Sequence, residues 1–103
     1  MCGIAGFVPA LGIAEPSALD PVRNMTARMS LRGPDAEGLW SGKGVVLGHR
    51  RLAILDLDAR ANQPMVSTDS RYIIVFNGEI YNFLELRRLL EIDGVAFRTT
   101  SDT

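Results

Sequence analysis

Runs of apolar and polar residues divide the chain into predicted strands and helices. The apolar run at residues 3–8 predicts a buried strand close to the amino terminus. Interruptions by proline and glycine predict a loop over residues 9–18. Asp20 is then a candidate N-cap and Pro21 a candidate first helical residue, because the first turn of a helix leaves its N–H groups unpaired. Apolar residues follow helical spacing from there to Met29, which predicts the first helix.

The middle of the chain is patterned as short strands joined by turns. Strands are predicted at residues 38–40 and 45–49, with residues 52–55 either continuing the second strand or forming another. The small and polar residues at 41–44 predict a hairpin connection between the first two strands. Residues 56–62 are polar and predict a loop. This region is therefore expected to be mainly β-structure.

The last third of the chain carries a further strand and the clearest helical pattern. Five strand-forming residues at 72–76 follow a polar turn at 67–70. A helix is predicted over residues 82–93, with Asn82 and Glu85 forming a capping box and Gly94 as the C-cap residue. The apolar stripe of this helix is expected to be core, and it consists of Phe83, Leu86, Leu89 and Leu90. Another strand is predicted at residues 95–99.

The order of these elements bears on the fold class and the number of domains. Strands and helices that mix without regular βαβ alternation favour an α+β fold. With 103 residues the chain forms one domain at most. The chain stops just after a predicted strand begins, so we expect it to be a piece of a longer domain.

Composition and charge exclude several classes of function. The chain is 47% hydrophobic and 22% charged, with a formal net charge of -1, which is typical of a soluble globular protein. Nucleic acids and anionic membranes need a dense basic patch, so neither is expected as a partner. No apolar run approaches the roughly 20 residues of a membrane helix. The apolar start lacks the basic residues of a secretion signal, so a cytoplasmic location is expected.

The single cysteine, Cys2, is the most informative residue of the chain. One cysteine and one histidine exclude a disulfide framework and the common metal-ligand spacings, so no metal site is expected. If the initiator methionine is removed, the thiol and a free α-amine belong to one residue. An α-amine has a pKa of about 7.7–8.0, so near neutral pH it can accept a proton from the thiol. Cys2 is therefore a candidate nucleophile that needs no histidine, although a small buried apolar role remains open.

A second candidate site is the tripeptide Asn77-Gly78-Glu79, which follows a predicted strand. The side-chain amide of Asn77 and the backbone N–H of Gly78 are neutral donors that could bind the oxygen of a tetrahedral intermediate. An Asn-Gly pair is also a common hairpin turn, and this alternative remains open.

Charged residues elsewhere could recognise a substrate that has both a carboxylate and an ammonium group. The planar guanidinium of Arg51 suits a carboxylate, and strand alternation sends Arg50 to the opposite face. Glu79 and Asp102 could each pair with an ammonium group, although ordinary surface acids remain an alternative. For His49 a structural role is favoured over a catalytic one. The Arg-Gly-Pro-Asp segment at 32–35 is interpreted as a structural turn with a possible internal ion pair.

Together these segments resemble the class II glutamine amidotransferases, and within them the glutamine-hydrolysing asparagine synthetases. The resemblance spans the chain from Cys2 to Asp102 and rests on five segments in register. These are Met1-Cys2-Gly3-Ile4-Ala5-Gly6, Arg32-Gly33-Pro34-Asp35, Gly48-His49-Arg50-Arg51-Leu52-Ala53-Ile54, Gln63-Pro64-Met65 and Asn77-Gly78-Glu79-Ile80-Tyr81-Asn82. It implies the four-layer αββα sandwich of the N-terminal nucleophile hydrolases, with antiparallel sheets. Residues 1–103 would be roughly the first half of that domain.

The resemblance also implies a role for each matching residue. Cys2 would attack the side-chain amide of L-glutamine, and Asn77 with Gly78 would form the oxyanion hole. The substrate-binding residues would be Arg51 for the α-carboxylate, Glu79 and Asp102 for the α-ammonium, and Leu52 and Ile54 as backbone lining of the pocket. Glutamate and ammonia would be the products.

In the family the ammonia passes to a C-terminal synthetase domain that uses ATP and Mg²⁺ to convert aspartate into asparagine. That domain is absent from this sequence, and no cofactor is expected within residues 1–103. Two alternatives stay open: a non-catalytic domain that keeps the fold for binding or assembly, and an amidotransferase for a sugar or lactam acceptor. A homodimer is also left open.

Overall fold

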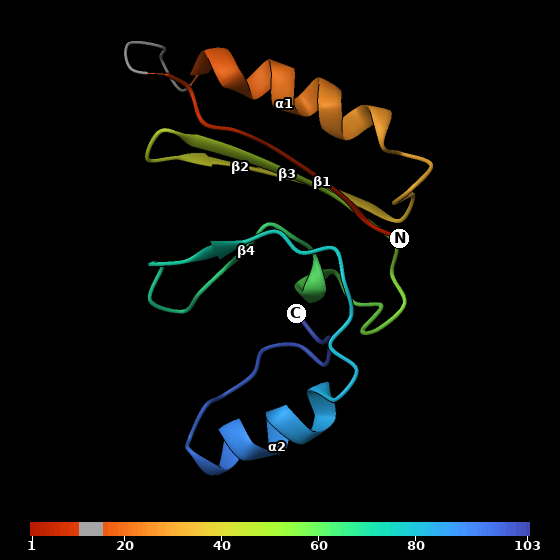
Figure 1. Cartoon of the computed structure of the whole chain (residues 1–103), viewed down its shortest axis with the longest axis vertical. Helices are drawn as coiled ribbons and strands as arrows, with labels where there is room; N and C mark the ends of the chain where they lie inside the picture. The colour runs from red at the N-terminus through yellow and green to blue at the C-terminus, as the bar shows by residue number, and fades with distance from the viewer. Residues whose placement is uncertain (11–15) are drawn as a thin grey trace.

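A three-stranded antiparallel sheet and a two-stranded antiparallel sheet give the molecule its α+β architecture (Figure 1). The computed structural model describes residues 1–10 and 16–103. The elements are β1 (Gly3–Phe7), α1 (Pro16–Arg28), β2 (Ala36–Gly42), β3 (Val45–Arg51), the 3₁₀-helix η1 (Ala59–Ala61), β4 (Met65–Val66), β5 (Ile73–Ile74) and α2 (Phe83–Ile92).

The larger sheet has the order β1-β3-β2, so β3 is its central strand. Ile4 of β1 and Gly38 of β2 both lie opposite His49 of β3. The hairpin between β2 and β3 turns at Lys43 and Gly44, whose φ angles are 53° and 76°. Two consecutive positive φ values are typical of a type I′ turn, which matches the twist of a hairpin. The predicted first strand and the predicted hairpin at 41–44 are therefore confirmed.

Helix α1 covers one face of this sheet and forms its apolar core (Figure 1). Ala18 and Val22 of the helix are buried against Val46 of β3. The prediction that the helix starts after Asp20 is wrong, because the helix already includes Pro16. Ala18 is buried against the sheet one turn before Val22, so the buried face of the helix begins before Asp20 and Pro21 lies inside the helix. Residues 11–15 of the predicted loop lie outside the described residues.

On the other face of the sheet the chain is less regular than the pattern predicted. Residues 52–55 are not a strand, and residues 95–99 are not a strand either. The predicted strand at 72–76 is reduced to Ile73–Ile74 in β5. The backbone N–H groups of Leu52 and Ala53 instead donate to the side chains of Cys2 and Asp35. A strand-like sequence pattern does not supply a neighbouring strand, so the backbone of Leu52 and Ala53 bonds to side chains instead.

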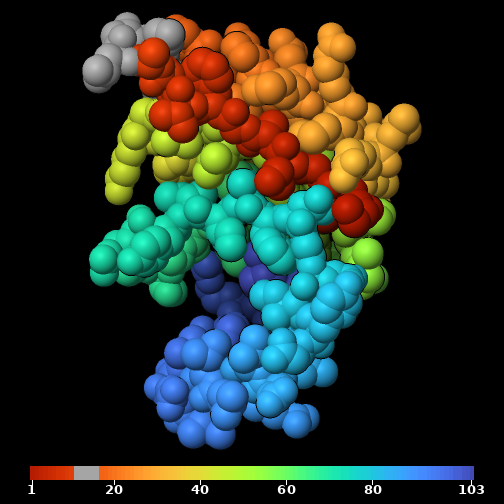
Figure 2. All heavy atoms as spheres, viewed as in Figure 1, coloured from red at the N-terminus to blue at the C-terminus, as the bar shows by residue number. Residues whose placement is uncertain are grey.

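Helix α2 has the predicted position but not the predicted surroundings. Gly94 has a φ of 89° and ends the helix as expected, while the side chain of Asn82 makes no capping hydrogen bond. The expectation that its apolar stripe is core is wrong, because Leu86, Leu89 and Leu90 are 41%, 55% and 43% exposed. The helix projects from one end of the molecule, away from the larger sheet (Figures 1 and 2). Spacing predicted which residues share a face, but not what covers that face.

Among residues 1–10 and 16–103, no helix has the length and apolar character that crossing a lipid bilayer requires.

Candidate active site

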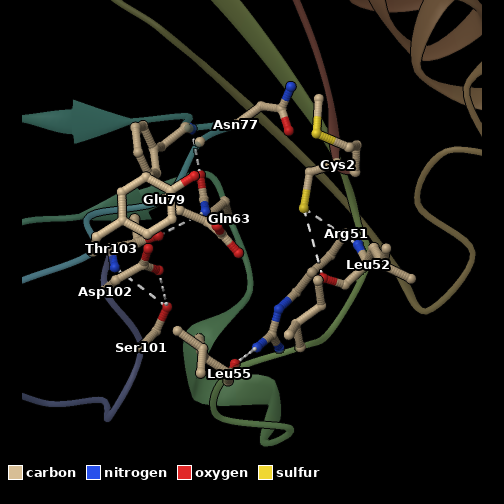
Figure 3. Close-up of a pocket in the computed structure, with 16 residues that line it drawn as sticks. Cys2, Arg51, Leu52, Leu55, Gln63, Asn77, Glu79, Ser101, Asp102 and Thr103 are labelled. Carbon is tan, nitrogen blue, oxygen red and sulfur yellow. Dashed lines mark hydrogen bonds between the residues drawn. The ribbon is translucent and has the colours of Figure 1, made fainter. Parts of the chain in front are cut away.

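A cavity of about 340 Å³ lies where the larger sheet meets the segments after residue 51. It brings together all the residues that the sequence singled out for substrate chemistry. These lining residues are Cys2, Arg51, Leu52, Ile54, Asn77, Gly78, Glu79 and Asp102. Figure 3 shows Cys2, Arg51 and Leu52 on one side, with Glu79 and Asp102 across from them. Segments up to 100 residues apart in the sequence therefore converge on one volume.

Cys2 immediately precedes strand β1, and its thiol contacts the backbone of Leu52. The sulfur accepts a hydrogen bond from the Leu52 N–H at 3.3 Å, and it lies 3.7 Å from the Leu52 carbonyl oxygen (Figure 3). The Cys2 carbonyl accepts a hydrogen bond from Nε of Arg32 at 3.3 Å. Cys2 is partly exposed and Met1 lines the cavity beside it. The sulfur is thus oriented by the backbone and remains accessible from the cavity.

The segment Asn77-Gly78 forms another wall of the cavity, just after β5. Asn77 is partly buried, and Gly78 is exposed. A Cβ atom at residue 78 would lie only 2.8 Å from the Phe76 ring, so a side chain there would displace that ring. Glycine therefore allows the Phe76 ring to lie this close to the backbone of residue 78. Two neutral donors, one from a side chain and one from the backbone, therefore lie on the same wall.

Arg51 ends β3 and is only 6% exposed. Its two terminal nitrogens donate four hydrogen bonds, to the carbonyls of Asp58, Leu55 and Asp56 and to Oδ1 of Asn62. A substrate carboxylate would therefore meet the Nε–H of Arg51, or would replace one of these acceptors. Arg50 points to the other face of the sheet and pairs with Glu37 at 2.6 Å, which confirms the predicted alternation.

The acidic residues of the cavity differ in how firmly they are held. Asp102 accepts a hydrogen bond from the Ile80 N–H at 3.0 Å, and its other oxygen is 3.3 Å from the Ser101 hydroxyl. Glu79 is exposed. The two carboxylates line the same cavity, and the bond to Ile80 ties Asp102 to the residue that follows Glu79.

Asp56 supports the loop that surrounds the Arg51 guanidinium. Its carboxylate accepts hydrogen bonds from the N–H groups of Thr100 and Asp58 and from Nε of Arg60. These donors, with Thr100 contributing most, lower the pKa of Asp56 from 3.8 to about 2. Sequence reasoning placed Asp56 only in a polar loop, because its partner at residue 100 is far away in the chain.

Two side chains of the turn at residues 32–35 hydrogen-bond to backbone next to the cavity. The possible ion pair between Arg32 and Asp35 is not what the structure forms. Arg32 donates to the Cys2 carbonyl, and Asp35 accepts from the Ala53 N–H at 2.8 Å. Both side chains therefore hold backbone that borders the cavity.

Two buried polar side chains were not assigned to the site by the sequence. His49 is 1% exposed and Gln63 is 7% exposed, and both contact the backbone of Phe76. Burial lowers the pKa of His49 below its usual value. Gln63 stands in the Gln-Pro-Met segment of the family resemblance, which was the one signal that it has a special place.

The metal-ligating side chains do not form a cluster in the part of the chain that the structure describes. No group of three or more His, Cys, Asp or Glu side chains there is arranged to hold a metal ion.

Comparison with known proteins gives a consistent result. All 103 residues match the family model described as a glutamine amidotransferase domain. Two asparagine synthetases [glutamine-hydrolyzing] of Bacillus subtilis, numbers 1 and 3, are 39% and 40% identical to this chain over its whole length. Asparagine synthetase [glutamine-hydrolyzing] 1 of Arabidopsis thaliana is 39% identical over 99% of the chain. The chain spans only 16% to 17% of the length of these three relatives.

Proposed function

This chain belongs to the glutamine amidotransferase domain family, and from that premise we propose that it hydrolyses the side-chain amide of L-glutamine. The observation that carries the proposal is the convergence of Cys2, Asn77, Gly78 and Asp102 on one cavity. A volume of about 340 Å³ is at the lower end of the range for small-molecule sites, which suits an amino acid.

Cys2 is proposed as the nucleophile once Met1 has been removed. The α-amine of Cys2 takes the thiol proton, and a bond forms between Sγ and the amide carbon of glutamine. The π electrons of the carbonyl move to its oxygen. When the tetrahedral intermediate collapses, the C–N bond breaks and ammonia leaves with the proton from the α-ammonium. Water then attacks the thioester, the C–S bond breaks, and glutamate and the free thiol are released.

Asn77 and Gly78 are proposed as the oxyanion hole for both tetrahedral intermediates. The negative charge develops on the former carbonyl oxygen, and neutral N–H donors stabilise it without a change of protonation. Both residues line the cavity that also contains the thiol.

Recognition of the amino-acid end of glutamine is proposed for the charged residues. Arg51 would bind the α-carboxylate, Glu79 and Asp102 the α-ammonium, while the backbone around Leu52 and Ile54 lines the pocket. The convergence of one cation and two carboxylates on a single cavity supports this assignment, because a free amino acid carries both charges.

The relatives suggest a larger assembly around this site. We propose that residues 1–103 are the first part of an amidotransferase domain with a four-layer αββα sandwich. The ammonia would pass to a synthetase domain that binds ATP and Mg²⁺ and forms asparagine from aspartate. The names of the relatives favour asparagine over sugar or lactam products. No step of the glutaminase reaction passes through ATP or the metal.

Replacement of the nucleophile tests the proposed function. In the intact protein, Cys2→Ala should abolish glutamine-dependent product formation and spare the activity with free ammonia, because ammonia bypasses the thiol. The matched measurement is the intact mass of the unsubstituted protein, which should lack Met1. Loss of both activities, or normal glutamine hydrolysis with Met1 still attached, would refute the role of Cys2.

A substitution of Asn77 tests the oxyanion hole. We expect Asn77→Ala to reduce transition-state stabilisation by about 2.7–4 kcal/mol, the value typical of one lost oxyanion donor. The measurement is kcat/KM for glutamate formation. A rate close to that of the unsubstituted protein would remove Asn77 from the oxyanion hole.

A further inference from the structure

The backbone of Phe76, the residue before Asn77, makes hydrogen bonds with two side chains from different parts of the chain. Its N–H donates to Oε1 of Gln63 at 2.5 Å, and its carbonyl oxygen lies 3.2 Å from Nε2 of His49. We call this pair of side chains the Phe76 clamp. His49 comes from the central strand β3, and Gln63 follows the helix η1. Both polar groups of one residue are thus held by side chains and not by a neighbouring strand.

The chemistry of the contact fixes the protonation of His49. A carbonyl oxygen only accepts hydrogen bonds, so Nε2 must carry the proton and donate to Phe76. Nδ1 is buried and has no hydrogen-bond partner among the described residues, so a second proton there would leave a buried N–H unpaired. Burial also lowers the pKa of His49. The ring is therefore a neutral donor with one role.

Gln63 is anchored well beyond its contact with Phe76. Its Nε2 donates to the Thr103 hydroxyl at 3.3 Å, so the side chain bridges Phe76 and the segment that carries Asp102 (Figure 3). Its backbone carbonyl lies against Gly38 of β2, where an added Cβ atom would be only 2.0 Å from that oxygen. A residue packed this closely on the sheet has little freedom to move. Its hydrogen bond to Phe76 therefore restricts the movement of the cavity wall relative to the sheet.

Building on the proposed function, we propose that His49 and Gln63 are positioning residues for the oxyanion hole. The carbonyl that His49 holds belongs to the peptide that also contains the N–H of Asn77. Rotation of this peptide would move the Asn77 side chain and then the Gly78 N–H. A misplacement of about 1 Å can lower a rate by about 10²-fold, so fixing the peptide supports the transition state and not the binding of glutamine.

The test uses variants of the intact protein that differ in the hydrogen bond to Phe76. His49→Phe removes the donor and keeps a ring, whereas His49→Gln places an amide N–H close to the position of Nε2. Gln63→Met removes the acceptor at similar volume. Thr26→Val is the matched control, because Thr26 is buried against Gly48 on the α1 face of β3 and its hydroxyl donates to the Val22 carbonyl of its own helix.

Two readouts separate positioning from general destabilisation. The first is kcat and KM for glutamate formation. The second is the affinity for the γ-aldehyde analogue of glutamine. Its carbonyl carbon forms a bond with Sγ of Cys2, and the thiol proton ends on the oxygen, which gives a tetrahedral adduct.

We expect His49→Phe and Gln63→Met to lower kcat by about 10²-fold, on the scale of a lost or misplaced oxyanion donor, with KM close to normal. Affinity for the aldehyde should fall in parallel, His49→Gln should recover most of kcat, and Thr26→Val should behave normally. If His49→Phe does not fold, Gln63→Met and His49→Gln give the same comparison.

The clamp is refuted if kcat is unchanged, if the aldehyde binds normally, or if Thr26→Val shows the same loss. It is also refuted if His49→Gln is as impaired as His49→Phe. Failure of the proposed function looks different: the unsubstituted protein would release no glutamate, or Cys2→Ala would release it at the normal rate. That result overturns the premise, whereas the preceding results overturn the clamp in an active enzyme.

Discussion

Residues 3–51 and residues 52–103 are stabilised in different ways. The first region has three strands of five to seven residues and a 13-residue helix packed on them. In the second region the strands have two residues each, and α2 has no buried residue. Regular hydrogen bonding and apolar burial maintain the first region, while side chains that bind backbone maintain the second.

The connection between the two regions is made by polar residues of the first. Arg51 and His49 lie on the face of β3 away from α1, and each donates to backbone carbonyls of the second region. The irregular region carries Asn77, Glu79 and Asp102, whose placement depends on neighbours far away in the sequence. The candidate site therefore combines Cys2 and Arg51 with loops that the sheet holds through buried polar side chains.

Removal of Arg51 should give the largest loss of stability. Arg51→Met deletes four hydrogen bonds from a charged donor, each typically contributing about 1.5–3 kcal/mol, and leaves buried acceptors unpaired. We expect the free energy of unfolding to fall by about 3 kcal/mol or more, because freed loop carbonyls regain some hydration. Urea unfolding of the intact protein measures this change.

The neighbouring arginine provides the control for that experiment. Arg50→Met removes one ion pair, with Glu37, on the other face of the sheet, so a smaller loss is expected because one charged contact is deleted in place of four hydrogen bonds. Equal effects of the two substitutions would show that the second region does not depend on Arg51.

A core substitution in the first region should have the next largest effect. Val22 is fully buried between α1 and β3, so Val22→Ala removes two methyl groups and leaves a small cavity. We expect a loss of about 2 kcal/mol in the free energy of unfolding, with little change in KM for glutamine. A change in KM without a change in stability would contradict the expectation that Val22 stabilises the core and does not influence the candidate site.

The pH dependence of stability probes the loop around Arg51. The pKa of Asp56 is lowered from 3.8 to about 2 in the folded protein, so the unfolded chain binds its proton first. The stabilisation by Asp56 is therefore complete above the ordinary pKa of 3.8 and is lost as the pH falls through about 2. Melting temperatures of the unsubstituted protein and Asp56→Asn should differ at pH 6 and converge on acidification, with pH 6 chosen roughly two units above that range. Parallel curves down to the acid limit would exclude this role.

The smallest effect is expected on α2. Leu89 is 55% exposed, so Leu89→Ala should change the free energy of unfolding by about 0.5 kcal/mol or less. The matched comparison is Val22→Ala, which removes apolar atoms from a fully buried position. A loss as large as that of Val22→Ala would show that another part of the intact protein covers this face of α2.

Much of the first region could be predicted because its signals are local. The strand-forming residues at 45–49 and the small and polar residues at 41–44 predict a hairpin within a short stretch of chain, and the structure pairs β2 with β3 there. The start of α1 lies before the N-cap signal at Asp20, and the contact of Ala18 with the sheet leaves no local signal in the sequence. The strands predicted at 52–55 and 95–99 failed for a related reason, since strand propensity does not provide a partner strand.

The candidate site was predicted through its motifs more than through its pattern. The chemistry of the residues and the resemblance together identified the candidate site residues, with Leu52 and Ile54 coming from the resemblance alone, and the structure brings them to one cavity. It did not identify His49 and Gln63 as a pair, because they are 14 positions apart and meet only through Phe76. Side chains that bind backbone leave no periodic signal in a sequence.

The family, the candidate nucleophile, the β2–β3 hairpin and the position of α2 follow from the amino-acid sequence, since each depends on residues close together in the chain. Only the tertiary structure decided which polar groups are buried, which carbonyls receive Arg51 and His49, and which apolar face stays exposed. Burial and hydrogen-bond partnership are set by the distance between residues in space, and local patterning does not encode that distance.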